Sequence, residues 1–264
     1  MNLRLGIVMV MMLLFAFACK KQSDPAIPPP FYPPNDTTAH TATPLPIVLD
    51  VTNGTSLYNT WGRLIALMSD STTVLSPGDT VYSSGQYGIA LFVDSSVTTY
   101  LDAGIISLNN DTVPHPPQYP FYKGNAIALQ YGANWAIQGS ADVPSFNFNY
   151  SGGFPSYSGP IPYQVSKDSG LHFTFNGTTV ANADSVYVVI TTVDSNNTVS
   201  YRQCFGANQG NVFITGSLYN FLPVSSISQG HLTIIPFKYT AQAFGHKKFV
   251  FVKQSEISHS VSIQ

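Results

Sequence analysis

Glutamate occurs only once in this chain of 264 residues, at Glu256, and that scarcity limits what the chain can fold into. Helical bundles and coiled coils depend on Ala, Glu, Lys, Leu and Arg, whereas charged residues make up only 9% of this sequence, against about 25% in a typical domain. Aromatic residues reach 13%, so the chain carries too many apolar groups to be an unstructured polyelectrolyte. The composition favours a folded protein built from strands.

The pattern along the chain agrees with strands. From Ile47 onward, short runs of Val, Ile, Phe, Tyr and Thr alternate with Gly, Asn, Asp, Ser and Pro. Residues 186–193 are apolar on both faces, which predicts a central strand. Asn176-Gly177 predicts a two-residue hairpin turn. Pro236 predicts an edge or bulged strand, because Pro has no N–H to donate to a ladder.

The expected strands are too many for one small sandwich. We therefore predict an all-β fold of two β-sandwich modules, at residues 47–143 and 144–264. The second module has about seven strands and resembles an immunoglobulin-like or fibronectin type III-like sandwich. Residues 56–68 stay open between helix and strand, because apolar residues there have helical spacing while strands are expected on both sides.

The N-terminal residues have the features of an export signal. Arg4 precedes an uninterrupted apolar run, Leu5 to Ala18, which is shorter than the roughly 20 residues that a membrane-spanning helix needs. The run ends directly before Cys19. This junction resembles the signal of bacterial lipoproteins of the Bacteroidota type. The resemblance implies that residues 1–18 form a lipoprotein signal peptide and that Cys19 is the lipid attachment site.

Residues 19–46 follow as the lipidated Cys and a Pro/Thr-rich linker. Eight prolines lie between Pro25 and Pro46, and Pro-rich chain favours an extended conformation. The linker is expected to hold the β modules away from the bilayer. The resemblance implies a protein of the outer membrane, whose partner is the membrane through the lipid anchor, on either the periplasmic or the cell-surface face.

Sequence motifs for catalysis are absent. The chain has no GxSxG, no phosphate-binding loop, no dinucleotide fingerprint and no HExxH. Most Asp residues precede Ser or Thr, a pattern typical of turns, and the six His are far apart in the sequence. We therefore expect no enzyme activity, no catalytic residues, no metal and no cofactor. A net charge of −2 gives no basic field for nucleic acid.

Aromatic residues are the remaining candidates for binding. The Pro-stiffened stretch 114–122 contains Tyr119, Phe121 and Tyr122, whose rings are suited to stack on a sugar or a Pro-rich peptide. Packing of these rings inside the fold is the alternative. The expected function is a membrane-anchored lipoprotein that displays β-sandwich modules for binding or scaffolding at the cell envelope, with a glycan or a protein as ligand. A carbohydrate-binding accessory of a polysaccharide uptake system and a hydrolase with an Asp pair are the alternatives.

The second cysteine, Cys204, has no partner for an intramolecular disulfide once Cys19 carries lipid. Free Cys is among the most buried residue types and packs as a small hydrophobe. We therefore expect Cys204 to be buried and structural.

Replacing the lipid attachment site tests the signal. Cys19→Ser should abolish membrane retention, because acyl chains, at about 0.8 kcal/mol per buried CH₂, are the expected anchor. The measurement is detergent-phase partitioning of the mutant and the wild-type chain. A mutant that still enters the detergent phase contradicts the lipoprotein interpretation.

Overall fold

The structure is a computed structural model that describes residues 60–264 except 77–78, 95–98, 131 and 195–196. The fold is all-β, with 62% of the described residues in strands and no α-helix among them. The predicted signal peptide, Cys19 and the linker to residue 46 lie outside the described residues, as does the start of the first predicted module.

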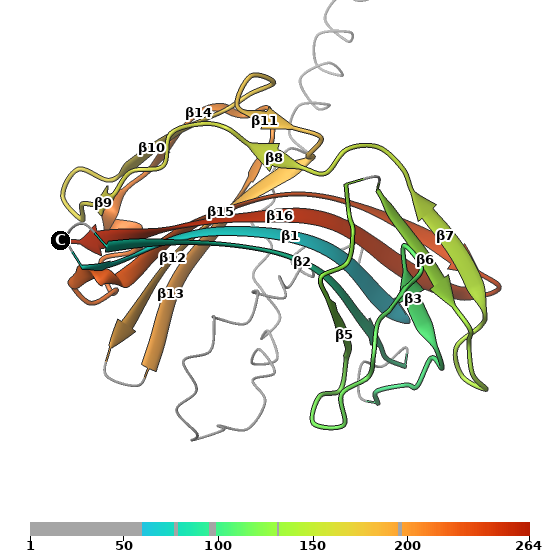
Figure 1. Cartoon of the computed structure of the whole chain (residues 1–264). Helices are drawn as coiled ribbons and strands as arrows, with labels where there is room; N and C mark the ends of the chain where they lie inside the picture. Colours follow the sequence, from blue (N-terminus) through green and yellow to red (C-terminus); the bar gives the residue numbers. More distant parts are fainter. Residues whose placement is uncertain (1–59, 77–78, 95–98, 131, 195–196) are drawn as a thin grey trace, which may run out of the picture. The chain divides into compact units, whose positions relative to one another are not determined.

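One large sheet organises the described residues (Figure 1). Its strands follow the order β13-β12-β15-β16-β1-β2-β5, and β9 pairs with the end of β16. Neighbours are antiparallel, except that β16 is parallel to both β1 and β9. The bounds are β1 (Gly62–Ser76), β2 (Asp79–Phe92), β5 (Tyr122–Asn125), β9 (Gln164–Val165), β12 (Ser185–Asp194), β13 (Asn197–Gly206), β15 (Ser225–Phe244) and β16 (Lys247–Ile263).

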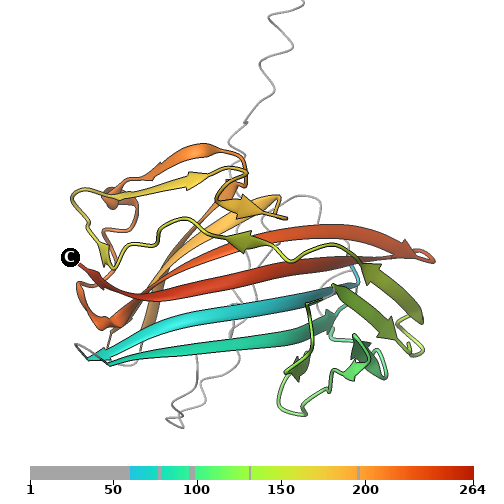
Figure 2. The ribbon, with the colours of Figure 1, turned by 45° about the horizontal axis from the view of Figure 1, so that its top comes forward.

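Two smaller groups of strands, which we call the first and second lobes, cover opposite ends of one face of this sheet (Figure 2). The first lobe is a four-stranded sheet of β3 (Ile106–Leu108), β4 (Asp111–Thr112), β6 (Ala133–Ile137) and β7 (Phe146–Tyr150). The second lobe contains two strand pairs and a 3-10 turn: β8 (Ser156–Tyr157), β10 (Leu171–Phe175), β11 (Val180–Ala181), β14 (Gly210–Ile214) and η3 (Gly216–Leu218). The fold is therefore a layered β structure with a split second layer.

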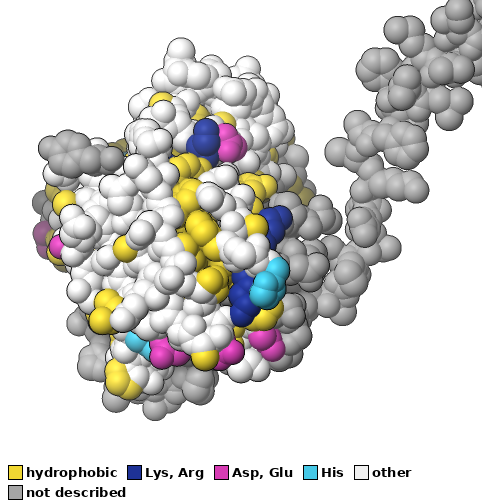
Figure 3. Space-filling view, turned by 90° about the vertical axis from the view of Figure 1, so that its right-hand side faces the viewer, with side chains coloured by type: hydrophobic (Ala, Val, Ile, Leu, Met, Phe, Trp, Pro, Cys, Tyr) yellow, Lys and Arg dark blue, Asp and Glu magenta, His cyan; other side chains and the backbone are white. Residues whose placement is uncertain are grey.

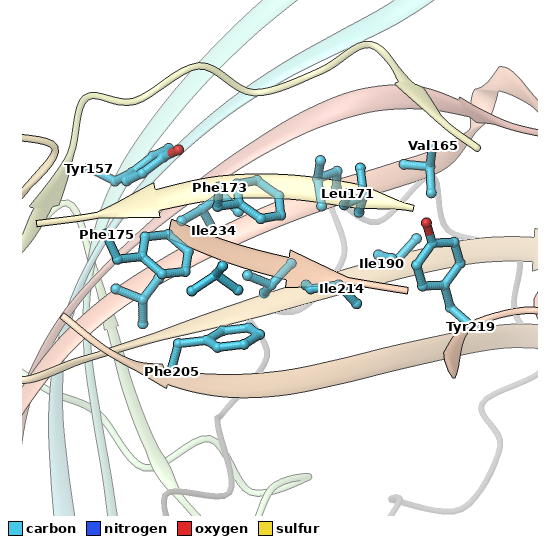
Figure 4. Packing of buried hydrophobic residues seen from close by; sticks show 14 of the residues in the cluster. Tyr157, Val165, Leu171, Phe173, Phe175, Ile190, Phe205, Ile214, Tyr219 and Ile234 are labelled. Atoms are coloured by element: carbon cyan, nitrogen blue, oxygen red, sulfur yellow. The ribbon is translucent and has the colours of Figure 1, made fainter. Parts of the chain in front are cut away.

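Strand alternation puts apolar side chains on both faces of the large sheet. The apolar residues buried between each lobe and the large sheet form two clusters, which we call the first-lobe core and the second-lobe core. On β1, Leu64 packs in the first-lobe core, while the next residue, Ile65, packs in a separate cluster on the other face of the sheet. On β16, Val261 and Ile263 enter the second-lobe core, part of which Figure 4 shows. Residues 62–68 belong to strand β1, in which Leu64 and Ile65 are buried on opposite faces as strand alternation requires, so the helix-or-strand question is settled for them in favour of a strand.

The two expected modules share this sheet. β1, which comes from the first expected module, pairs along eleven residues with β16 from the second, from Gly62↔Phe249 to Thr72↔His259. β6 and β7, which lie on either side of the expected boundary between 143 and 144, pair with each other in the first lobe. The chain after residue 60 therefore forms two lobes on one continuous sheet, and not two sandwiches with separate sheets.

A buried lysine holds the segment that joins the lobes. Lys253 on β16 is only 2% exposed, and its Nζ donates hydrogen bonds to the carbonyl oxygens of Ser151, Gly152 and Gly153 at 2.8, 2.9 and 3.0 Å. The ammonium also lies 4.5 Å from the centre of the Tyr150 ring. Gly152 has a φ of 82°, a left-handed conformation that glycine adopts without strain. The segment after β7 thus crosses the large sheet directly over Lys253.

Two local predictions were wrong. Asn176-Gly177 does not join a hairpin: β10 pairs with β14, and the Asn176 carbonyl accepts the N–H groups of Thr179 and Val180 in a turn toward β11. Pro236 lies in β15, which is a central strand between β12 and β16 and not an edge strand. The register of β15 against β16 does shift between Ser225 and Gly230, but it does not shift at Pro236. The strand accommodates it through a gap in pairing with β16, which stops at Ile234↔Ile257 and resumes at Phe237↔Gln254.

The lysine contact generates a stability prediction. Lys253→Met keeps the apolar stem but leaves three carbonyl oxygens without their donor, so the free energy of unfolding should fall by about 2–4 kcal/mol. Urea unfolding measures the change. The matched control is Lys238→Met, at the position paired with Lys253 on β15. Lys238 makes only a surface ion pair with Asp184 at 3.7 Å, so its loss should cost less than about 1 kcal/mol. Equal effects of the two substitutions would contradict the assigned role of Lys253.

Candidate functional site

An open pocket of about 320 Å³ lies on the first lobe, where the segment after β4 meets β3 and β5. It combines one carboxylate, one imidazole, one side-chain amide, two hydroxyl groups and several apolar groups. The lining residues are Asp102, Gly104, Ile105, Ile106, Thr112, Val113, Pro114, His115, Tyr122 and Gln138. They come from four separate stretches of chain, which the pairing of β3 with β4 and β6 brings together.

Tyr122 and Asp102 form the fixed part of this pocket. The Tyr122 ring is buried, its hydroxyl donates to Asp102 Oδ1 at 2.5 Å, and it accepts the Ala103 N–H at 2.8 Å. Burial, followed by the bond to Asp102, raises the pKa of Tyr122 to about 12. The same bond from Tyr122, followed by one from the Gly104 N–H, lowers the pKa of Asp102 below its usual value. The pocket thus holds an ionised carboxylate beside a neutral phenol.

The rim of the pocket is more exposed. The His115 ring stacks on Tyr122, with centroids 4.5 Å apart and planes 24° from parallel, and its Nε2 lies 3.0 Å from the Tyr119 carbonyl oxygen. The Ile105 side chain is 65% exposed. Figure 3 views the end of the sheet that carries the first lobe: apolar side chains form a narrow band on this face, and charged and His side chains lie mainly toward its lower and right-hand edges. The pocket lining itself contains one carboxylate and no Lys or Arg, which suits a neutral ligand with hydroxyl groups better than an anion.

The three predicted binding rings do not form one surface. Tyr122 lies in the pocket, but its ring is only 3% exposed. Tyr119 and Phe121 stack on each other, with centroids 5.0 Å apart, and both are half-buried. Phe121 packs against the cluster on the other face of the large sheet. The stretch 114–122 therefore contributes one side chain of the predicted set to the pocket, together with His115.

A second, smaller pocket of about 210 Å³ lies on the large sheet itself. Its lining includes the carboxylate of Asp70 and the imidazole of His259, on the paired strands β1 and β16. Asp70 is its one acidic residue, just as Asp102 is in the first-lobe pocket. Neither pocket holds the carboxylate pair that glycoside hydrolysis uses, and the described residues contain no group of three His, Cys, Asp or Glu able to hold a metal ion.

Cys204 is exposed, so the prediction of a buried thiol was wrong. It lies on β13, the outermost strand at one side of the large sheet, on the same side of that strand as Arg202. Alternation sends Tyr201 and Phe205 into the second-lobe core and leaves Cys204 facing the other way. Neighbouring atoms still partly desolvate the Cys204 sulfur, and this raises the pKa of the thiol above its usual value.

Sequence reasoning missed Asp102, Thr112 and Gln138. Each lies in or beside a turn, where Asp, Thr and Gln are ordinary residues, and no spacing in the sequence joins them. His115 lies in the stretch 114–122, but only Tyr119, Phe121 and Tyr122 of that stretch were predicted to bind a ligand. Only the pairing of β3, β4 and β6 places these four side chains around one hollow.

Comparisons with known protein families, with curated proteins and with solved structures found no match. Among the described residues, there is also no helix with the length and apolar character needed to cross a bilayer.

Glu256 has the most strongly shifted carboxyl pKa of the described residues, although it lines neither pocket. Its Oε2 is buried and has no hydrogen-bond partner within the described part of the chain, and burial raises its pKa from 4.5 to about 7. The folded protein therefore holds a proton between pH 4.5 and 7 that the unfolded chain releases. Stability from this group is present at low pH and is lost as pH rises through that window.

Glu256→Gln should remove this pH dependence. Relative to wild type, the free energy of unfolding of the variant should increase by up to about 3 kcal/mol between pH 4.5 and pH 8. The two chains must be compared at each pH by urea unfolding, because His231 and His259, whose pKa values burial lowers, titrate with the opposite sign. Asp70→Asn, on the neighbouring strand, is the control. A constant difference between Glu256→Gln and wild type across this range would show that the carboxyl is not desolvated.

Proposed function

We propose that this protein is a lipid-anchored protein of the cell envelope that uses its β fold to bind a ligand and has no catalytic role. The junction at Cys19 and the Pro-rich linker support the anchored part of the proposal. The pocket of Asp102, Tyr122 and His115 is the observation that supports the binding part.

The chemistry of that pocket favours a glycan as ligand. A hydroxyl-rich ligand needs hydrogen-bond acceptors and donors beside an apolar surface, and these are present in Asp102, Gln138 and the exposed Ile105. The pocket has no Lys or Arg to neutralise a phosphate or carboxylate ligand. Its single carboxylate argues for binding over hydrolysis, since hydrolysis of a glycosidic bond uses two. A carbohydrate-binding accessory in polysaccharide uptake is therefore the narrower form of the proposal.

A glycan array with the full chain tests this function. The wild-type protein should retain neutral glycans, and His115→Ala should weaken that binding about fivefold, since one ring contact contributes about 1 kcal/mol. The substitution should leave stability nearly unchanged because His115 is exposed. Protease treatment of intact cells then reports whether the β fold faces outward.

The second lobe offers a matched control. His172 is also exposed and stacks on an aromatic ring, that of Phe213, at the same centroid distance of 4.5 Å. It lines neither pocket, so His172→Ala should bind as wild type does. Absence of binding by the wild-type chain contradicts the glycan proposal, and equal losses in the two variants would move the site away from the first-lobe pocket.

A further inference from the structure

The face of the large sheet opposite the lobes is apolar and buried. Nine side chains, each at most 6% exposed, form one cluster there: Ile65, Leu67, Ile89, Tyr187, Val189, Ile235, Phe237, Val250 and Val252. We call these nine residues the central patch. All of them belong to β1, β2, β12, β15 and β16, so the patch crosses five neighbouring strands.

The described residues provide almost no second layer for the central patch. The strands of both lobes pack in the two clusters on the other face. Three half-buried residues contact the patch, and of these Tyr87 and Tyr239 belong to the sheet itself, while Phe121 lies before β5. An apolar sheet face of this size needs a layer over it, because the fold loses the stabilisation of burial if water covers it.

Two hydrogen-bond acceptors on the same face point to polypeptide as the covering layer. Gln254 pairs in register with Leu67 and Phe237 of the patch, is 1% exposed, and its Oε1 has no hydrogen-bond partner among the described residues. Glu256, two residues further along the same side of β16, has a buried Oε2 that also lacks a partner. Buried acceptors are normally satisfied, and backbone N–H groups are the usual donors.

The chain before Thr60 contains a segment with the matching pattern. In Leu45-Pro46-Ile47-Val48-Leu49-Asp50-Val51, the odd-numbered residues are all apolar, while Pro46 and Asp50 lie among the even-numbered ones. In an extended conformation, residues 45, 47, 49 and 51 would share one apolar face. That face is complementary to the central patch.

The length of the chain permits this contact. Five strands at about 4.8 Å spacing make the patch about 19 Å wide, and seven extended residues span about 23 Å. β1 starts at Gly62, only three residues before Ile65 of the patch. Residues 52–60 can extend up to about 30 Å, so they can join the segment to β1 from any point on the patch.

We propose that residues 45–51 of this chain lie across the central patch and form the missing layer on that face of the large sheet. The patch is then an internal contact and not a ligand site. The free linker ends near residue 44, which leaves about 25 residues after Cys19 as the spacer, a reach of at most about 78 Å in polyproline II.

Cysteine accessibility in the full chain tests this contact. The reporters are Val189→Cys in the central patch and Val188→Cys in the second-lobe core, each in a Cys204→Ser background. Ile47→Asp or Leu49→Asp should raise the maleimide labelling rate of Val189→Cys at least about tenfold and leave Val188→Cys unreactive. Val48→Asp, on the other side of the segment, is the matched control and should have a much smaller effect.

Hydrogen exchange of the unsubstituted chain is the second measurement. Amides within residues 45–51 should exchange at least about tenfold more slowly than those of residues 26–43. Exchange of 45–51 as fast as the linker overturns the proposal, even where the Asp variants unfold the whole protein and expose both reporters together. Unchanged labelling of Val189→Cys in both Asp variants also overturns it, and a dimer in solution would then assign the patch to a second copy of this chain.

Discussion

The contact of Lys253 with three backbone carbonyls is the constraint on which the arrangement of the lobes depends. A fully buried ammonium is costly unless its donors are satisfied, and here all three donors are used by consecutive residues of the segment that leaves β7. Ser255 adds a hydrogen bond to the Pro155 carbonyl at 2.6 Å, two residues further along β16. The chain is thereby fixed at the place where it passes from the first lobe to the second. Each lobe then packs on its own part of one sheet.

The low charge of the chain has a structural counterpart. The central part of the large sheet is buried on both faces, so its strands need apolar residues at successive positions there and leave few sites for charges. Phe249-Val250-Phe251-Val252 on β16 illustrates this, since the two Phe enter the first-lobe core and the two Val enter the central patch. The Asp102 pocket is open, and its lining contains one carboxylate and no Lys or Arg.

Predictions from local sequence patterns were correct where the residues of a single strand determine its place in the fold. The strand at 186–193 is central, as its apolar character on both faces predicted. Patterns failed where a distant partner decided the outcome. Asn176-Gly177 has a hairpin sequence, but β14, more than thirty residues later, is the strand that pairs with β10. Cys204 is a residue type that is usually buried, but it lies on an outermost strand with its side chain turned away from the lobe.

The sequence by itself determined the class of fold, because composition and strand periodicity are local properties. The proposal of an exported, tethered protein rests on the sequence alone, through its N-terminal apolar run and Cys19. Only the tertiary structure decided that β1 lies beside β16 in parallel, which merges the two expected modules into one sheet. It also decided which side chains surround the first-lobe pocket. Asp102, His115 and Gln138 lie in segments between strands, and they meet because hydrogen bonds between strands distant in sequence hold those segments together. Pairing of this kind depends on the whole sheet, and no short window of sequence contains it.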